Sequence, residues 1–194
     1  MKKRLGPQSR CYPMPIPLVL SGMGNDATMF AVAWMTVCGS NPPALAMVVG
    51  RRHHTVALIR ETRAYTVNFA PASLAREVDY CGLVSGRDHH KVAETGLTLA
   101  PSSVITPPII EECPYNLECR YVEEIELATG SLMMVGEIVE AHADEEVLTD
   151  DGKSADPGKL DPLVYFTGTR EYFRLGEHVA DAYSVGRELM EERE

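Results

Sequence analysis

Short runs of apolar and β-branched residues, separated by proline- and glycine-rich turns, recur along most of this chain. They predict strands at 17–21, 44–50, 64–70, 117–128, 132–143, 163–166 and 171–175. These runs do not alternate with helices as regular βαβ units, and no glycine-rich phosphate turn follows the first of them. We therefore expect a mainly β fold, a closed antiparallel barrel with short helices at its ends.

Helical patterns are few. The segment 55–62 has apolar residues at helical spacing, and Thr55 is its expected N-cap. A second helix is predicted over 73–82, with Ser73 as the cap and Gly82 at its end. The segment 154–162 is expected to be an irregular crossing loop, and the polar tail to be helical in part.

The length of 194 residues fits one domain with extensions. We predict an N-terminal arm over 1–14, the domain over 15–176 and a tail over 177–194. Prolines at 13, 15 and 17 interrupt the apolar start, which argues against a signal peptide, and no run reaches the ~18 apolar residues of a membrane span. These features predict a cytoplasmic protein that does not bind membranes.

Charge and cysteine content exclude further classes. The formal net charge of −10 argues against a nucleic-acid partner, which would require a basic face. The five cysteines are odd in number and include no CxxC pair, so we expect reduced, mostly buried thiols and no structural zinc. His89 and His90 are adjacent and lack a third ligand, so no metal site is expected there.

Three segments have the composition of a ligand site. The segment 25–43 contains the single tryptophan, Trp34, among small and hydroxyl residues, which suits either a flavin ring or a buried core strand. The segment 50–55, GRRHHT, precedes a predicted helix and suits either a phosphate or a solvated basic turn. The segment 81–91 offers loop N–H groups and a lysine. Sequence patterns of serine hydrolases, P-loop proteins and zinc proteases do not occur, and no acid–base pair stands out.

Taken in order, these segments carry a family resemblance. The tryptophan segment ending in NPP, the CGLVSGRDHHK loop and the VGEIVEAHADE strand resemble the flavoredoxin branch of the flavin-reductase-like proteins over about 15–176. The resemblance implies an antiparallel, Greek-key-like split β-barrel that binds FMN. It also implies a homodimer with FMN near the subunit interface, and NADH or NADPH as the reductant.

The resemblance also assigns residues. It places the flavin ring beside Trp34 and its neighbours, and the phosphate on Thr55, Lys91 and the loop N–H groups. Gly50 and Ser131 stand where the family often has arginine and histidine, and one of the basic residues at 51–53 is expected to compensate for Gly50. No catalytic acid or base is assigned. The expected FMN-binding residues are Thr28, Ala33, Trp34, Met35, Thr36, Arg51, Arg52, His53, Thr55, Ser85, Gly86 and Lys91.

Three functions remain open at this stage. The first is an NAD(P)H-dependent flavin reductase, in which the cofactor supplies the redox chemistry and the protein positions the rings. The second is a flavoredoxin-type electron carrier, whose acidic surface docks a basic redox protein. The third is a non-catalytic protein that binds a flavin, haem or similar cofactor as a store or sensor.

Overall fold

The computed structural model describes residues 1–191. Its centre is a seven-stranded sheet, antiparallel throughout, in the order β3-β2-β6-β9-β10-β5-β4. The strands are β2 (Leu18–Ser21), β3 (Thr28–Ala31), β4 (Met35–Ser40), β5 (Pro43–Gly50), β6 (Ala64–Phe69), β9 (Tyr115–Glu126) and β10 (Ser131–Ala143). The prediction of a mainly β, antiparallel fold is confirmed.

The two edge strands of this sheet, β3 and β4, are neighbours in the sequence and are joined by residues 32–34 alone. We call these three residues the seam. The N–H of Val32 donates to the carbonyl of Pro17 at 3.0 Å, and the N–H of Val48 donates to the carbonyl of Trp34 at 2.8 Å. These two hydrogen bonds attach the seam to the residue before β2 on one side and to β5 on the other. The seam therefore brings the two edges of the curled sheet together.

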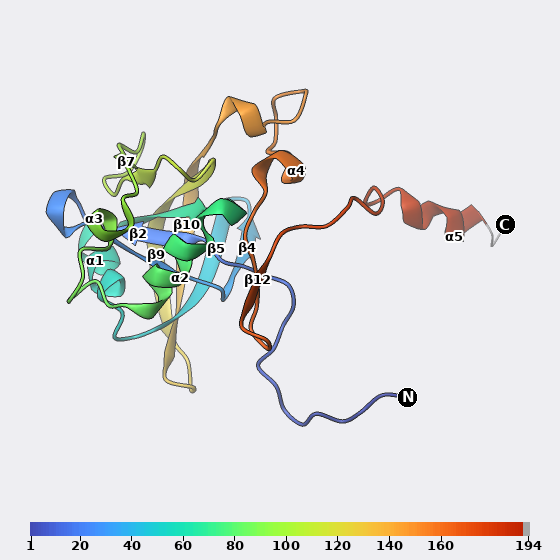
Figure 1. Ribbon diagram of the computed structural model, residues 1–194, viewed down its shortest axis with the longest axis horizontal. Helices are drawn as coiled ribbons and strands as arrows, with labels where there is room; N and C mark the ends of the chain where they lie inside the picture. Colours follow the sequence, from blue (N-terminus) through green and yellow to red (C-terminus); the bar gives the residue numbers. More distant parts are fainter. Residues whose placement is uncertain (192–194) are drawn as a thin grey trace.

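Short helices cover one side of the sheet (Figure 1). The helix α1 (His54–Thr62) packs on β2 and β6, whereas α2 (Ala75–Leu83) and α3 (Lys91–Thr95) pack on β3. Val19 on β2 points into a core shared by β5, β6, β9 and β10, and its neighbours Leu18 and Leu20 join a second core that includes α2. Burial on both faces explains why this strand is apolar throughout.

Both predicted helix starts need correction. The N-cap of α1 is His53, and Thr55 is the second residue of the helix. Ser73 lies in a 3-10 turn, η2 (Ala72–Leu74), so that α2 begins at Ala75 without a side-chain cap. Since Pro71 fixes the chain direction before η2, the turn displaces the helix by two residues.

The remaining elements are short. The strands β1 (Met14–Pro15), β11 (Val164–Phe166) and β12 (Glu171–Phe173) form a small sheet, and β7 (Leu99–Ala100) pairs with β8 (Ile109–Ile110). The predicted crossing loop contains a helix, α4 (Pro157–Leu160), capped by the side chain of Asp156. The others are η1 (Gly24–Asp26), η3 (Glu145–Val147), η4 (Val185–Arg187) and α5 (Glu188–Glu191).

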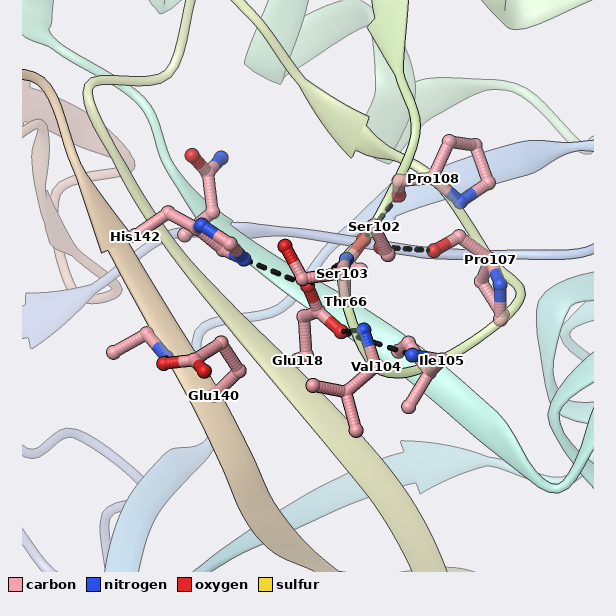
Figure 2. Close-up of polar contacts among 12 residues, drawn as sticks. Thr66, Ser102, Ser103, Val104, Ile105, Pro107, Pro108, Glu118, Glu140 and His142 are labelled. Atoms are coloured by element: carbon pink, nitrogen blue, oxygen red, sulfur yellow. Dashed lines mark hydrogen bonds and ion pairs between the residues drawn. The ribbon is translucent and has the colours of Figure 1, made fainter.

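A buried carboxylate ties the loop 101–108 to the long β9–β10 hairpin (Figure 2). Glu118 on β9 is fully buried and accepts hydrogen bonds from the N–H groups of Ser103, Val104 and Ile105 at 2.6–3.0 Å. His142 on β10 lies 2.6 Å from the same carboxylate. Burial raises the pKa of Glu118, but these donors outweigh it and leave the pKa below its usual value.

The sequence predicts reduced, mostly buried thiols and no membrane span, and the structure bears on both predictions. Cys81, Cys113 and Cys119 are buried, whereas Cys11 and Cys38 are exposed, and all five are free. Across residues 1–191, every helix is too short or too polar to cross a membrane.

Candidate functional site

Two adjoining hollows lie where the seam meets the start of α1. The first, the seam hollow, has a volume of about 240 Å³ and is lined mainly by apolar residues of 30–34 and 48–50, with Ser131. The second, the helix hollow, has a volume of about 310 Å³ and is lined by residues 52–55, 82–86 and Lys91. Phe30, Gly50 and His53 line both, so the two form one continuous groove.

The seam hollow offers a flat apolar wall beside main-chain donors. Trp34 lies between β3 and β4 and is 47% exposed. The alternative interpretation, a core strand with a buried tryptophan, is therefore wrong. Within residues 1–191, the N–H groups of Ala33 and Trp34 donate to no protein oxygen. An aromatic ligand with polar edge atoms could use both features.

The helix hollow has the features of an anion site. The N–H groups of His54 and Thr55 open the nine-residue helix α1, and those of Ser85 and Gly86 lie in the loop after α2. For residues 1–191, no protein acceptor is found for any of these four N–H groups. Arg52 lines the same hollow, so a phosphate there would meet free donors, a helix N-terminus and a guanidinium.

The loop at Gly86 is packed directly on Thr28 of β3. A Cβ atom at Gly86 would lie 2.5 Å from Oγ1 of Thr28, closer than real side chains approach. Oγ1 of Thr28 is itself buried and has no hydrogen-bond partner among the described residues. Glycine at 86 therefore lets the loop backbone lie against the barrel at the floor of the hollow.

His53 occupies the space that a side chain at 50 would take. Its ring stacks on Phe30 with centroids 5.1 Å apart, and a Cβ at Gly50 would lie 3.1 Å from the ring carbon Cδ2. Desolvation, and then the positive charge of Lys91, lower the pKa of His53 below its usual value. The ring is therefore mainly neutral at pH 7, and it can both donate and accept a hydrogen bond.

Lys91 lies beneath the helix hollow and is almost fully buried. Its ammonium donates to the carbonyls of Met29 at 2.9 Å and Cys81 at 2.8 Å, which ties α3 to β3 and α2. Burial lowers the pKa of Lys91, and the nearby Cys81 opposes this effect. Two of its three donors are thus occupied by the protein.

Comparisons with known proteins show to which family this chain belongs. The family model for the flavin reductase like domain matches residues 9–175. The chain belongs to this family. The flavoredoxin of Desulfovibrio vulgaris (Miyazaki F) is 34% identical, with a TM-score of 0.90 over 96% of this chain and 100% of its own. The flavoredoxin of Methanosarcina acetivorans is 33% identical, with a TM-score of 0.87 over 98% of both chains.

A more distant solved structure agrees on the fold. A Shewanella frigidimarina protein with a split barrel domain is 22% identical, with a TM-score of 0.79 over 89% of this chain and 87% of its own. The sequence resemblance to flavin-reductase-like proteins and the split-barrel fold that it implies are therefore confirmed. The chain has the flavin-binding fold of this family.

The groove of this flavin-reductase-like chain brings together most of the predicted site residues, with three exceptions. Ala33, Trp34, Arg52, His53, Thr55, Ser85, Gly86 and Lys91 line it, and Thr28 lies under the loop. Arg51 instead forms an ion pair with Glu126, at the end of β9. Met35 packs against the core, and Thr36 is exposed with its hydroxyl near the carbonyl of Val37.

The sequence prediction missed several lining residues, among them Phe30, Val48, His54, Leu83 and Ser131. Ser131 was noted only as a departure from the family pattern. It reaches the groove because it pairs with Gly50 across β10 and β5. This pairing spans about eighty residues of sequence, so local pattern gives no signal for it.

Proposed function

We propose that this chain binds FMN in the groove formed by the two hollows and acts as an NAD(P)H-dependent flavin-reductase-like oxidoreductase. One observation carries the proposal. A mainly apolar hollow with main-chain donors opens directly into a hollow lined by the start of α1, the loop at Ser85 and Gly86, and Arg52, and Phe30, Gly50 and His53 line both. FMN has this composition, an aromatic ring system joined by a short chain to one phosphate.

The residues present fit FMN, and each has a separate task. The N–H groups of residues 54, 55, 85 and 86 would hold the phosphate, with Arg52 adding a charge-assisted hydrogen bond. The seam would support the ring and offer the N–H groups of Ala33 and Trp34 to its polar edge. When bound, FMN supplies the hydride- and electron-accepting chemistry, and the protein supplies position and electrostatics.

The proposal of a nicotinamide reductant depends on access to the seam hollow. Trp34 lines this hollow and is about half exposed, and Ser131, which also lines it, has a short side chain. A second flat ring therefore has room to approach without displacing a large side chain. Productive reaction needs this positioning more than an acid or a base.

A flavoredoxin-type electron carrier is the second candidate. Two observations favour it: the likeness to two flavoredoxins over almost the entire chain, and the net charge of −10. An acidic surface would attract a basic redox protein and speed the encounter. In this case reduction would need that protein and not a nicotinamide.

A homodimer is part of the proposed function. The outer face of β5, β9 and β10 exposes Ile125, with Met133 and Val48 partly exposed beside it, and Trp34 lies exposed next to Val48. We call this the outer sheet face. It adjoins the seam hollow at Trp34, so a second copy seated on it would close the open side of the flavin groove and exclude water.

The deciding test is the visible absorbance spectrum of the purified chain after FMN is added and the excess removed, followed by anaerobic NADH and then NADPH. Retained flavin bands that bleach with either nucleotide are the expected result. Bands that persist until a reduced redox protein is added would favour the electron carrier. A chain that retains no flavin would refute the proposed FMN site.

A further inference from the structure

Residues 177–191 leave the body of the protein, and every side chain of theirs whose burial the structure describes is exposed. Figure 1 shows residues 177–191, the acidic arm, running outward after β12 and ending in the short helix α5. Val179 is 95% exposed and Tyr183 is 96% exposed. Within the described residues, every hydrogen bond and ion pair of this arm joins two of its own residues. Large apolar side chains so fully exposed indicate a surface that is covered in the assembled protein.

The other end of the chain has the opposite charge. Residues 1–12, the basic arm, contain no acidic residue. Most of this arm projects from the body (Figure 1), whereas Tyr12 at its end stacks on Phe166 with ring centroids 5.0 Å apart. The basic residues of this arm are Lys2, Lys3, Arg4 and Arg10. The acidic arm has four acidic residues and one arginine, Arg187. No ion pair joins the two arms of one chain in the part that the structure describes.

An apolar groove lies beside the bases of both arms. Its volume is about 370 Å³, and its walls are almost entirely apolar. Residues 13–17, which follow the basic arm, form one side, and Leu175, which precedes the acidic arm, lies on its rim. Phe69, Tyr115 and Leu163 complete it. A tyrosine or valine side chain from an extended segment would find matching apolar walls there.

Length and direction favour a second copy of this chain as the source of that segment. The fifteen residues of the acidic arm reach about 50 Å when extended, whereas a domain of this size has a radius of gyration of about 16 Å. The arm is thus long enough to cross a neighbouring subunit, and Figure 1 shows it directed away from its own body. The likeness to the M. acetivorans flavoredoxin covers 98% of this chain, so it takes in most of both arms.

We infer that the acidic arm crosses to a second copy, where Tyr183 and Val179 enter the apolar groove and the acidic side chains lie along the partner's basic arm. The inference rests on the proposed homodimer and adds a second contact to it. Two-fold symmetry makes the exchange reciprocal, so two arms bridge each dimer.

A disulfide trap tests the crossing, since the basic arm already contains the exposed thiol Cys11. The variant Ser184→Cys places a thiol next to Tyr183, in a Cys38→Ser background that removes the other exposed cysteine. Mild oxidation of the full-length chain should give a covalent dimer on a non-reducing gel, and the same variant with Cys11→Ser should not. A disulfide within one chain, or none at all, would overturn the inference.

Removal of the arm gives a second measurement. We expect the chain ending at Gly176 to dimerise at least tenfold more weakly in analytical ultracentrifugation, with the Tyr183→Ser chain between it and the parent. The variant Met23→Ser, also at an exposed apolar residue, is the matched control. Equal dissociation constants with and without the arm would overturn the arm contact alone, whereas a monomeric parent would remove the proposed dimer as well. Flavin retention, measured in parallel, reports separately on the FMN site.

Discussion

Gly86 lies where the loop after α2 meets the barrel, and no other residue fits there without moving the backbone. A methyl group would lie 2.5 Å from Oγ1 of Thr28, a buried atom on β3, which is packed against β2, α2 and α3. The loop would move outward instead. Its two free N–H groups would then leave the positions in which we propose that they hold phosphate.

The substitution Gly86→Ala should therefore weaken FMN binding at least tenfold, which corresponds to about 1.4 kcal/mol. Quenching of FMN fluorescence on titration with protein gives the dissociation constant. The matched control is Gly176→Ala, since nothing lies within 4 Å of a Cβ at that position. Equal affinity in both variants would exclude the loop from the phosphate site.

Individual residues also mark the limit of sequence reasoning. The GRRHHT segment suits either a phosphate or a solvated basic turn, and Arg52, His53 and Thr55 all line the helix hollow. The sequence does not distinguish Arg51 from them, because its partner Glu126 follows seventy-five residues later, at the end of β9. A local pattern identifies basic residues at a helix start, but the direction of each side chain depends on its distant neighbours.

At the scale of elements, the β9–β10 hairpin and the loop 101–108 are held together by one buried charge. Glu118 satisfies three consecutive loop N–H groups and contacts His142 (Figure 2). The substitution Glu118→Gln removes the charge and turns an amide toward at least one donor. We expect it to lower the free energy of unfolding by about 2–3 kcal/mol in urea titrations.

Glu140→Gln, on the exposed part of β10 and also drawn in Figure 2, is the control and should change stability by less than about 0.5 kcal/mol. The pH dependence has a definite sign. The folded-state pKa of Glu118 is depressed, so its stabilisation is present above the unfolded-state pKa of glutamate and is lost as pH falls through the folded-state value. The difference between the parent and Glu118→Gln should therefore shrink in acid, and a constant difference would contradict this account.

Element types were largely predictable, and element starts were not. The apolar run at 44–50 corresponds to β5, and the alternating runs at 117–128 and 132–143 correspond to β9 and β10. Thr55 and Ser73 were expected to cap helices because their side chains suit that position. The structure uses His53 and a 3-10 turn instead, since packing onto β2 and β3 fixes where each helix begins.

For the whole molecule, the proposed dimer links stability to concentration. A chain that folds only as a dimer loses about 1.4 kcal/mol of apparent stability per tenfold dilution. For a dimer of this size the midpoint of thermal unfolding should fall by about 2 °C with each such step. Calorimetry over three decades of protein concentration measures this, and a constant midpoint would indicate a monomer or a dimer that dissociates before it unfolds.

The seam has a consequence for the order of folding. Strands β3 and β4 are separated by three residues in sequence but stand at opposite ends of the seven-stranded order, so the sheet between them closes only after the five intervening strands have paired. Those pairings join residues as distant in sequence as Ala44 and Glu137, and contacts of such range form slowly. The ligand groove is thus assembled last. A cofactor that recognises the seam binds only chains that have finished folding. The rate of its uptake during refolding would therefore report the rate at which the barrel closes.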